Sequence, residues 1–354
     1  MTLQRIETTT TVAPEAEVGP AHEKSPGGPA PDVAAFNAAA LRCIADTRFS
    51  EARALLAQAL EIQPSDPVTQ CNLGLLFAHE GEVRLAQQHY RMAQTLAPDL
   101  VEAYFNSAVL HHRCSEFDAA EAAYLRARAL RPFHPEISFC LGTLYREIGR
   151  NEDAACAYRR AIELRNDYPE SHHDLGVLLM NGGALSEAEQ CFRDALNLSP
   201  GYADALYNLA LVHGLTGRHA QAAELLRSAH AVAPNRSDIC NNLAMVLMCE
   251  RDTQEEAEAL LHDLIKREPE HPEAHANLGC LLRQKGNVAE AESMLRRALK
   301  LRPEAAELEE QLGLLLQETG RFQAAEEAYR RALKLRPGLV SAQQYLDKLT
   351  GSVS

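Results

Sequence analysis

Pro67–Leu100, PVTQCNLGLLFAHEGEVRLAQQHYRMAQTLAPDL, contains the pattern that decides the fold of this chain. Apolar residues around Leu73 have the spacing of one helix face, and Gly81 follows where a glycine commonly ends a helix. A second apolar run with helical spacing includes Tyr90, and Pro98 prevents the continuation of that helix. The stretch therefore predicts two helices joined by a short turn.

The same pattern returns along the chain with a nearly constant period. An alanine recurs at steps of 34 residues, with a single step of 35. These alanines are Ala52, Ala86, Ala120, Ala154, Ala188, Ala222, Ala257, Ala291 and Ala325. A proline follows most of them, and a glycine or alanine precedes each of them where two helices must cross closely. A period of this length is typical of stacked helix pairs.

These features resemble the tetratricopeptide repeat, a 34-residue helix–turn–helix unit. The matching residues in the quoted stretch are Leu73, Gly74, Phe77, Ala86, Tyr90, Ala93 and Pro98. The resemblance implies an all-α fold. We expect a right-handed α-solenoid of about nine such units, closed by a C-terminal capping helix.

The period divides the chain into a tail, nine repeats and a final helix. The expected repeats are 33–66, 67–100, 101–134, 135–168, 169–202, 203–236, 237–271, 272–305 and 306–339. Residues 1–32 are rich in Thr, Pro, Gly and Glu, which predicts a disordered tail. Residues 340–354 should form the capping helix and a short tail. The seventh repeat has one extra residue before Ala257, for which we expect a longer turn.

One face of each first helix points away from the apolar contacts on a helical wheel, so that it should line a concave groove. Its sixth position is Asn, Asp or Gln in seven of the nine repeats. The residues of this ladder are Asn72, Asn106, Asp174, Asn208, Asn242, Asn277 and Gln311. A carboxamide both donates and accepts hydrogen bonds, so the ladder could hold the backbone of an extended peptide. The pattern is similar to the repeat arm of O-GlcNAc transferases, without their catalytic domain. Alternatively, the ladder only bonds neighbouring repeats.

Larger side chains lie beside the ladder on the same predicted face. They are Phe105, Phe139, His173, Tyr207, Met245 and Met248. We expect them to be exposed in the groove as anchors for apolar side chains of a partner. The alternative is that the rings pack on an adjacent repeat. Acidic residues also recur in the first turn of the first helices, where they either make the groove rim negative or stabilise the helix dipoles.

Composition excludes several classes of function. The chain has 354 residues and a formal charge of −14, which disfavours binding to nucleic acid. Its apolar runs are too short to span a bilayer, and its start lacks the apolar core of a secretory signal. The nine cysteines are scattered without a CxxC pair, as in proteins of a reducing compartment. We therefore expect a soluble, cytoplasmic protein without membrane insertion.

Residues for catalysis are not evident in the sequence. It contains no Gly-rich phosphate loop, GxSxG or HExxH motif. The pairs His111-His112 and His172-His173 are adjacent on helices and point about 100° apart, so neither pair can chelate one metal ion. We predict no enzyme activity, no cofactor and no metal. The expected function is a scaffold that binds one or more partner proteins or extended peptides in the groove.

Two other functions stay open at this point. The chain could be an accessory subunit that delivers substrate to a separate glycosyltransferase-type enzyme. It could also be a structural scaffold that assembles with itself, in which case it forms homo-oligomers.

Overall fold

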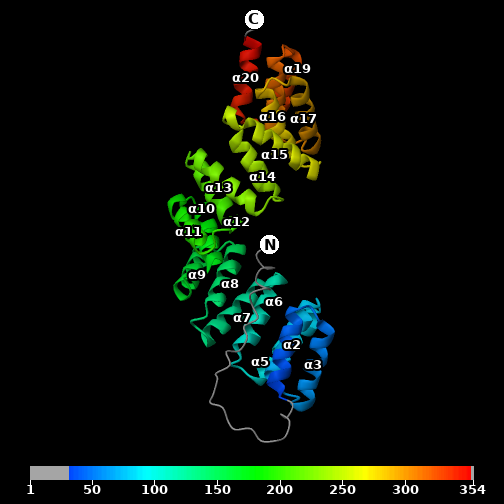
Figure 1. Cartoon of the computed structure of the whole chain (residues 1–354), viewed down its shortest axis with the longest axis vertical. Helices are drawn as coiled ribbons and strands as arrows, with labels where there is room; N and C mark the ends of the chain where they lie inside the picture. The colour runs from blue at the N-terminus through cyan, green and yellow to red at the C-terminus, as the bar shows by residue number, and fades with distance from the viewer. Residues whose placement is uncertain (1–31, 352–354) are drawn as a thin grey trace. The chain divides into compact units, whose positions relative to one another are not determined.

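The computed structural model describes residues 32–351, which form α-helices joined by short turns, with one 3-10 helix and no strand (Figure 1). The first helices of the pairs are α2 (Val33–Ala45), α4 (Pro67–His79), α6 (Val101–Arg113), α8 (Pro135–Glu147), α10 (Pro169–Asn181), α12 (Ala203–Leu215), α14 (Ser237–Leu247), α16 (Pro272–Gln284) and α18 (Ala306–Glu318). The second helices are α3 (Phe49–Ile62), α5 (Val83–Leu96), α7 (Phe117–Leu130), α9 (Asn151–Leu164), α11 (Leu185–Leu198), α13 (His219–Val232), α15 (Gln254–Arg267), α17 (Val288–Leu301) and α19 (Phe322–Leu335). The predicted all-α architecture is confirmed.

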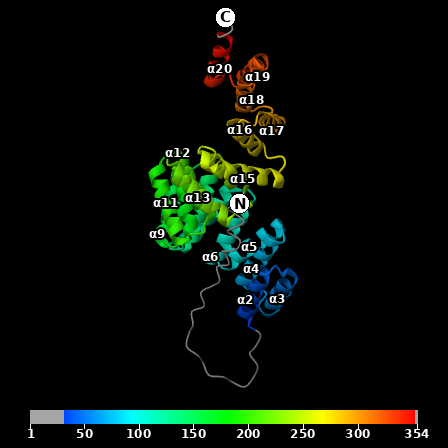
Figure 2. The same ribbon diagram turned by 45° about the horizontal axis from the view of Figure 1, so that its top comes forward.

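The chain forms two compact units, an N-terminal unit that ends at Leu178 and a C-terminal unit that begins at Leu179, so that the boundary falls within α10. Apart from α10, which contains the boundary, a second helix packs against the first helix of its own pair and against the first helix of the next pair (Figure 2). Each unit is therefore an α-solenoid of consecutive helix pairs. The expected disordered tail lies outside the described residues, apart from Asp32.

In every pair but the seventh, the turn between the two helices has one residue in the left-handed region of the backbone map. Gly81 has φ of 81° at this place in the second pair. Thr47 and Ser115 occupy the same place in the first and third pairs, with φ of 60° and 59°. A side chain makes this conformation unfavourable, so these two turns are less favourable than the glycine turns.

Small residues allow the two helices of a pair to cross closely. A methyl group added at Gly74 would lie 2.6 Å from Cδ1 of Tyr90, whose ring is buried against the glycine. Gly142 and Tyr158 repeat the arrangement with the same 2.6 Å distance. The glycine thus makes room for a tyrosine ring in the core of the pair.

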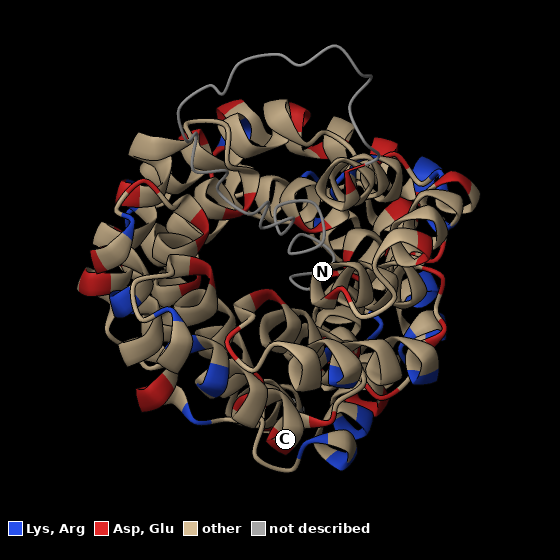
Figure 3. Ribbon diagram, turned by 90° about the horizontal axis from the view of Figure 1, so that it is seen from below, with Lys and Arg blue, Asp and Glu red and all other residues tan. Residues whose placement is uncertain are grey.

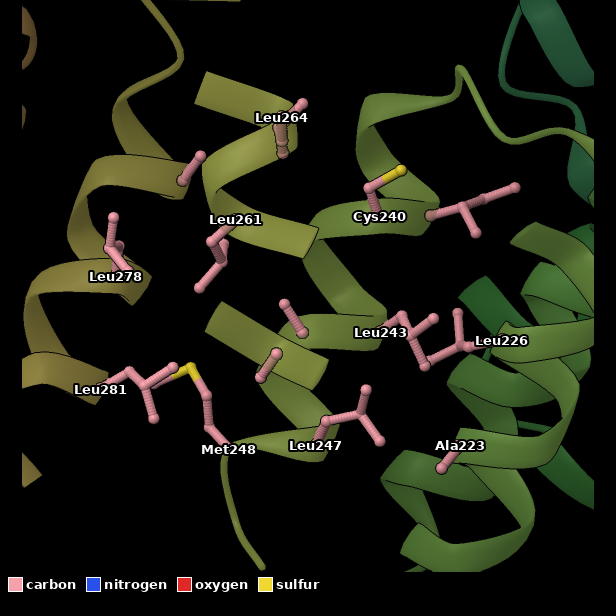
Figure 4. Close-up of a cluster of buried hydrophobic side chains, with 14 of the residues drawn as sticks. Ala223, Leu226, Cys240, Leu243, Leu247, Met248, Leu261, Leu264, Leu278 and Leu281 are labelled. Atoms are coloured by element: carbon pink, nitrogen blue, oxygen red, sulfur yellow. The ribbon is translucent and has the colours of Figure 1, made fainter. Parts of the chain in front are cut away.

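The seventh pair departs from the others, as its extra residue predicts. A 3-10 helix, η1 (Arg251–Thr253), lies in the turn between α14 and α15. The core continues through this pair, because Leu243 of α14, Leu261 and Leu264 of α15, and Leu278 of α16 belong to one buried cluster (Figure 4). Leu264, which replaces the usual alanine, is fully buried.

A last helix, α20 (Val340–Gly351), follows the ninth pair and packs against α19. The ring of Tyr345 stacks on that of Tyr329, with centroids 5.7 Å apart, and Leu349 is buried in the same cluster. This helix covers apolar surface that the next repeat would cover in a longer array. In the part of the chain described here, no helix combines the length and the apolar character needed to cross a bilayer.

Candidate protein-binding site

The first helices of the N-terminal unit line a pocket of about 770 Å³, called here the N-terminal groove. Helices α2, α4 and α6 form most of its wall, and α8 contributes Ile137. The residues that line it are Asp32, Val33, Ala34, Asn37, Ala38, Leu41, Arg42, Ala45, Gln63, Asp66, Val68, Cys71, Asn72, Leu75, Leu100, Val101, Glu102, Phe105, Asn106, Arg131, His134 and Ile137. Apolar side chains predominate, and the first two ladder asparagines, Asn72 and Asn106, lie among them.

The ladder residues of the N-terminal unit are bonded to other residues of the chain. Asn72 donates a hydrogen bond through Nδ2 to Oδ1 of Asn37, at 2.8 Å, and both side chains are buried. Asn106 contacts Sγ of Cys71 at 3.8 Å in the same way. Asp174 is buried, and its carboxylate accepts from Nδ1 of the adjacent His173 at 2.9 Å.

Asn37 is a residue that sequence reasoning missed. Its Nδ2 donates to Oγ1 of Thr69 at 2.9 Å and to Oδ2 of Asp66 at 3.2 Å, while its Oδ1 accepts from Asn72. It therefore connects α2 to the start of α4. The signal was a polar residue at the fifth helical position, where the third and fourth repeats have Phe105 and Phe139.

The ladder of the C-terminal unit shows the same inter-repeat bonding. Asn242 donates to the hydroxyl oxygen of Tyr207 at 2.7 Å, and Asn277 donates to Oδ1 of Asn241 at 2.9 Å. The remaining ladder residues Asn208 and Gln311 are half-buried, and Sγ of Cys280 donates to Oε1 of Gln311 at 3.6 Å. The alternative role of the ladder, bonding between repeats, is thus present at several positions.

These bonds use only part of the hydrogen-bonding capacity of each asparagine side chain. The bonds of Asn72, Asn106, Asn242 and Asn277 to the preceding repeat use one N–H group each. No described residue donates to their side-chain oxygens, and these oxygens are not sealed from solvent. A carboxamide has two donor hydrogens and an oxygen with two lone pairs. The preceding repeat therefore orients each amide while its oxygen stays available as an acceptor.

The predicted exposure of the aromatic anchors is wrong for Phe105 and Phe139. Their rings are 2% and 5% exposed. Phe105 packs against Tyr124 with centroids 5.9 Å apart, and Phe139 packs against Tyr158 at 5.8 Å and Tyr168 at 5.0 Å. The fifth position faces the seam between a repeat and the next one, so that a large ring there is covered from both sides.

The other four predicted anchors differ in how far their side chains are exposed. His173 and Met248 are buried, contrary to the prediction, whereas Met245 is half exposed. Tyr207 is half-buried, and its hydroxyl is engaged by Asn242. Only Phe105 among them lines the N-terminal groove, as part of its apolar wall.

Arginines neutralise the acidic residues at the start of the first helices. Glu102 pairs with Arg131 at 3.3 Å, and Glu136 pairs with Arg165 at 2.6 Å. The same arrangement recurs in the pairs Glu273–Arg302 and Glu307–Arg336. Acidic and basic residues are accordingly interspersed along the helices (Figure 3). The groove rim is therefore not a uniformly negative surface.

The pKa of Glu136 shows how strongly such partners stabilise the charged form of a carboxylate. Burial acts to raise its pKa, but a hydrogen bond from His134 and the charge of Arg165 outweigh burial and lower the pKa to about 2. The carboxylate is thus ionised at neutral pH and committed to its partners.

The described residues offer no cluster of metal ligands. Within 32–351, no group of three or more His, Cys, Asp or Glu side chains could hold a metal ion. His111 contacts Glu116, and Nε2 of His112 lies 2.9 Å from Glu147, so the two histidines have separate partners. The Cys71 thiol in the groove wall is buried, which raises its pKa to about 12 and keeps it protonated.

Comparisons with known proteins identify similar repeats. A tetratricopeptide-repeat family model matches residues 113–169 and 277–340. A model described as the cilia and flagella-associated protein 70 middle TPR-like domain matches residues 158–292. No curated protein matches the sequence significantly.

Several solved structures have a similar arrangement of helices. The pilF protein of Pseudomonas aeruginosa is 19% identical over 60% of this chain and 97% of its own, with a TM-score of 0.52, which shows a shared fold. YrrB, described as a TPR protein with an unusual peptide-binding site, is 23% identical over 52% of this chain and 95% of its own, with a TM-score of 0.45. TTC0263 of Thermus thermophilus is 24% identical over 51% of this chain and 98% of its own, with a TM-score of 0.44.

Proposed function

This chain is a tetratricopeptide-repeat protein, and from this premise we propose that it is a protein-interaction scaffold whose N-terminal groove binds an extended segment of a partner protein. Repeats of this family indicate protein–protein interaction. We propose in addition that the chain has no catalytic activity of its own.

The N-terminal groove is the feature of the structure that most directly supports this function. Its volume of about 770 Å³ lies within the range of protein ligand sites, roughly 300–1,000 Å³. Packed helices lie about 8–10 Å apart, and an extended chain advances about 3.3–3.6 Å per residue. An extended segment would therefore pass one first helix for about every three residues.

The ladder supports an extended conformation of the ligand. Asn72 and Asn106 line the groove one repeat apart, with side-chain oxygens that accept no bond from any described residue. Each oxygen can accept a hydrogen bond from a backbone N–H of the bound segment, which requires no particular sequence. The apolar wall would then bind side chains that point into the groove.

The experiment blocks the groove without touching the ladder. Ala38 is an exposed residue that lines the groove, whereas Ala35 is exposed on the same helix and does not line it. Partners are captured from the native host with the wild-type chain, Ala38→Trp and the matched control Ala35→Trp, and are quantified by mass spectrometry. Circular dichroism first checks that all three chains are equally helical.

A partner bound in the groove is retained by the wild type and Ala35→Trp and lost with Ala38→Trp. Equal recovery of every protein by all three chains would refute the groove as the binding site. The identity of the lost protein also separates the two alternatives. A glycosyltransferase or its substrate favours the delivery role, and a second copy of this chain favours self-assembly.

A further inference from the structure

The first described residues of the chain lie at the N-terminal groove. Asp32, Val33 and Ala34 line the groove, and Asp32 caps the start of α2 through a hydrogen bond from the N–H of Ala34 at 3.0 Å. Residues 1–31 precede them directly in the sequence and lie outside the described residues. A stretch of this segment that suits the groove is therefore held near it by the chain itself.

The charged side chains of the groove lining determine where a basic residue of a ligand would bind. They are Asp32, Asp66, Glu102, Arg42, Arg131 and His134. Glu102 pairs with Arg131 at 3.3 Å, and His134 contacts a carboxylate outside the lining. Asp32 and Asp66 precede the first turns of α2 and α4, and both accept hydrogen bonds from neutral groups only. Arg42, which has no hydrogen bond or ion pair with any residue of 32–351, lies in the last turn of α2. The starts of α2 and α4 therefore form an uncompensated negative end of the groove.

Residues 3–12, LQRIETTTTV, have a composition that suits this groove. Leu3 and Ile6 supply large apolar side chains, and no other Leu or Ile occurs before the first helix. The threonines and Ile6 are β-branched and favour an extended chain, and the stretch contains no Gly or Pro. Arg5 lies between the two large apolar residues, and Glu7 makes the stretch neutral overall. A neutral stretch with a cation between apolar residues suits an apolar lining that has charges of both signs and a negative end.

The linker between this stretch and the groove has a suitable length. Residues 13–31 separate the stretch from Asp32. A coil of about 20 residues has a root-mean-square length of roughly 22–27 Å. Helix α4 packs against both α2 and α6, so that the groove extends over two helix spacings, or roughly 16–20 Å. Because the linker length is similar to this span, the effective concentration of the stretch at the groove is on the order of 1 mM.

We propose that residues 3–12 bind in the N-terminal groove of their own chain and compete there with partner segments. Leu3 and Ile6 contact the apolar wall, and Arg5 pairs with the carboxylates at the starts of α2 and α4. The competition rests on the proposed function, because a partner must use the same groove. With a dissociation constant of about 100 μM, an effective concentration of about 1 mM fills about nine-tenths of the grooves and weakens partner binding about tenfold.

A photo-crosslinker in the full chain tests where the stretch binds. p-Benzoylphenylalanine replaces Thr9, so that the apolar residues and Arg5 are kept. The chain is irradiated at low micromolar concentration, and mass spectrometry identifies the cross-linked residues. We expect cross-links to the groove lining within single chains. They should be lost in Ala38→Trp, which blocks the groove, and kept in its control Ala35→Trp.

Two further pairs of variants test the contacts and the competition. Arg5→Glu should lower the cross-linking yield to about half, because repulsion in place of attraction weakens binding about tenfold. Lys24→Glu makes the same change of charge in the linker and should leave the yield unchanged. In partner capture from the native host, Ile6→Asp should raise the recovery of the groove-dependent partner about tenfold, whereas the matched linker variant Val18→Asp should not.

The remaining outcomes separate this inference from the proposed function. If residue 9 forms no cross-link with the lining, or forms it equally in Ala38→Trp, the stretch does not bind in the groove and the proposed function is unaffected. If the cross-links join two chains, the occupant is the N-terminal segment of a second copy, and the inference is wrong. If Ile6→Asp leaves the recovery of a groove-dependent partner unchanged, the competition is refuted. If the cross-links depend on the groove but no captured protein does, the stretch binds as proposed, and the proposed function fails.

Discussion

Replacement of Asn37 by alanine tests whether this buried residue holds the first two repeats together. Its side chain is 5% exposed and makes three hydrogen bonds, to Asn72 and Thr69 of α4 and to Asp66, the residue just before that helix. Two go to the neutral groups of Asn72 and Thr69, and one goes to the carboxylate of Asp66. The substitution removes all three and leaves the amide of Asn72, which is 6% exposed, without its acceptor.

The expected loss follows from these contacts. A neutral hydrogen bond contributes about 1 kcal/mol, a bond to a charged group about 1.5–3 kcal/mol, and a buried unsatisfied donor costs about 1–3 kcal/mol. Thr69 and Asp66 keep their mutual bond of 2.6 Å, which limits the sum. We expect the opening free energy of α2 and α4 to fall by about 3 kcal/mol, which corresponds to a roughly hundredfold loss of protection against hydrogen exchange.

Hydrogen exchange read by mass spectrometry measures this loss helix by helix. Asn242→Ala is the matched control, because its amide makes one 2.7 Å bond to the half-buried Tyr207. There we expect a loss of about 1 kcal/mol, or roughly fivefold in protection, around α12 and α14. Equal losses in the two variants, or a loss below about fivefold in α2 and α4 for Asn37→Ala, would refute the reasoning.

Three further perturbations test the fold. Ser115→Gly relieves a left-handed turn with φ of 59° and should raise the free energy of unfolding by about 0.5–1 kcal/mol; an unchanged or lower urea midpoint would contradict this. Gly142→Ala places a methyl group 2.6 Å from the Tyr158 ring and should cost about 1–2 kcal/mol, seen as a lower melting temperature. Hydrogen bonds from Arg218 are the main cause that lowers the pKa of Glu189 from 4.5 to about 2. Its stabilisation is therefore present above about pH 4.5 and is lost as pH falls towards 2. Denaturant titrations at pH 6 and pH 3.5 should show a smaller loss of stability for Arg218→Gln than for the wild type, and an equal loss would exclude this pair as a source of the pH dependence.

The sequence alone predicts the helix pairs, because their determinants are local. The 34-residue period, the turn glycines such as Gly81 and the prolines after the second helices fix where each helix begins and ends. The small residue at Gly74 also predicts a close crossing, which the structure shows as contact with Tyr90. Sequence reasoning likewise anticipated a longer turn in the seventh pair, where η1 lies.

The sequence predicts only in part which side chains of the first helices line the groove and which are covered by the next repeat. A helical wheel gives the direction of a side chain around the axis of its own helix. Asn72 and Asn106, which the wheel assigns to the groove face, line the pocket of the N-terminal unit. The wheel does not give the angle at which the next repeat packs. That angle decides whether the fifth position is open or covered, and it buries Phe105 and Phe139 against neighbouring rings.

The tertiary structure alone identifies the partners of polar and charged groups. Asn37 and Asn72 are 35 positions apart, and their hydrogen bond depends on how α4 lies against α2. The lack of any described partner for Arg42 depends in the same way on where every other acidic side chain is held. Periodicity determines the repeat because helix formation depends on near neighbours in the chain. Groove chemistry depends on contacts between repeats, where a small change in packing decides which groups meet.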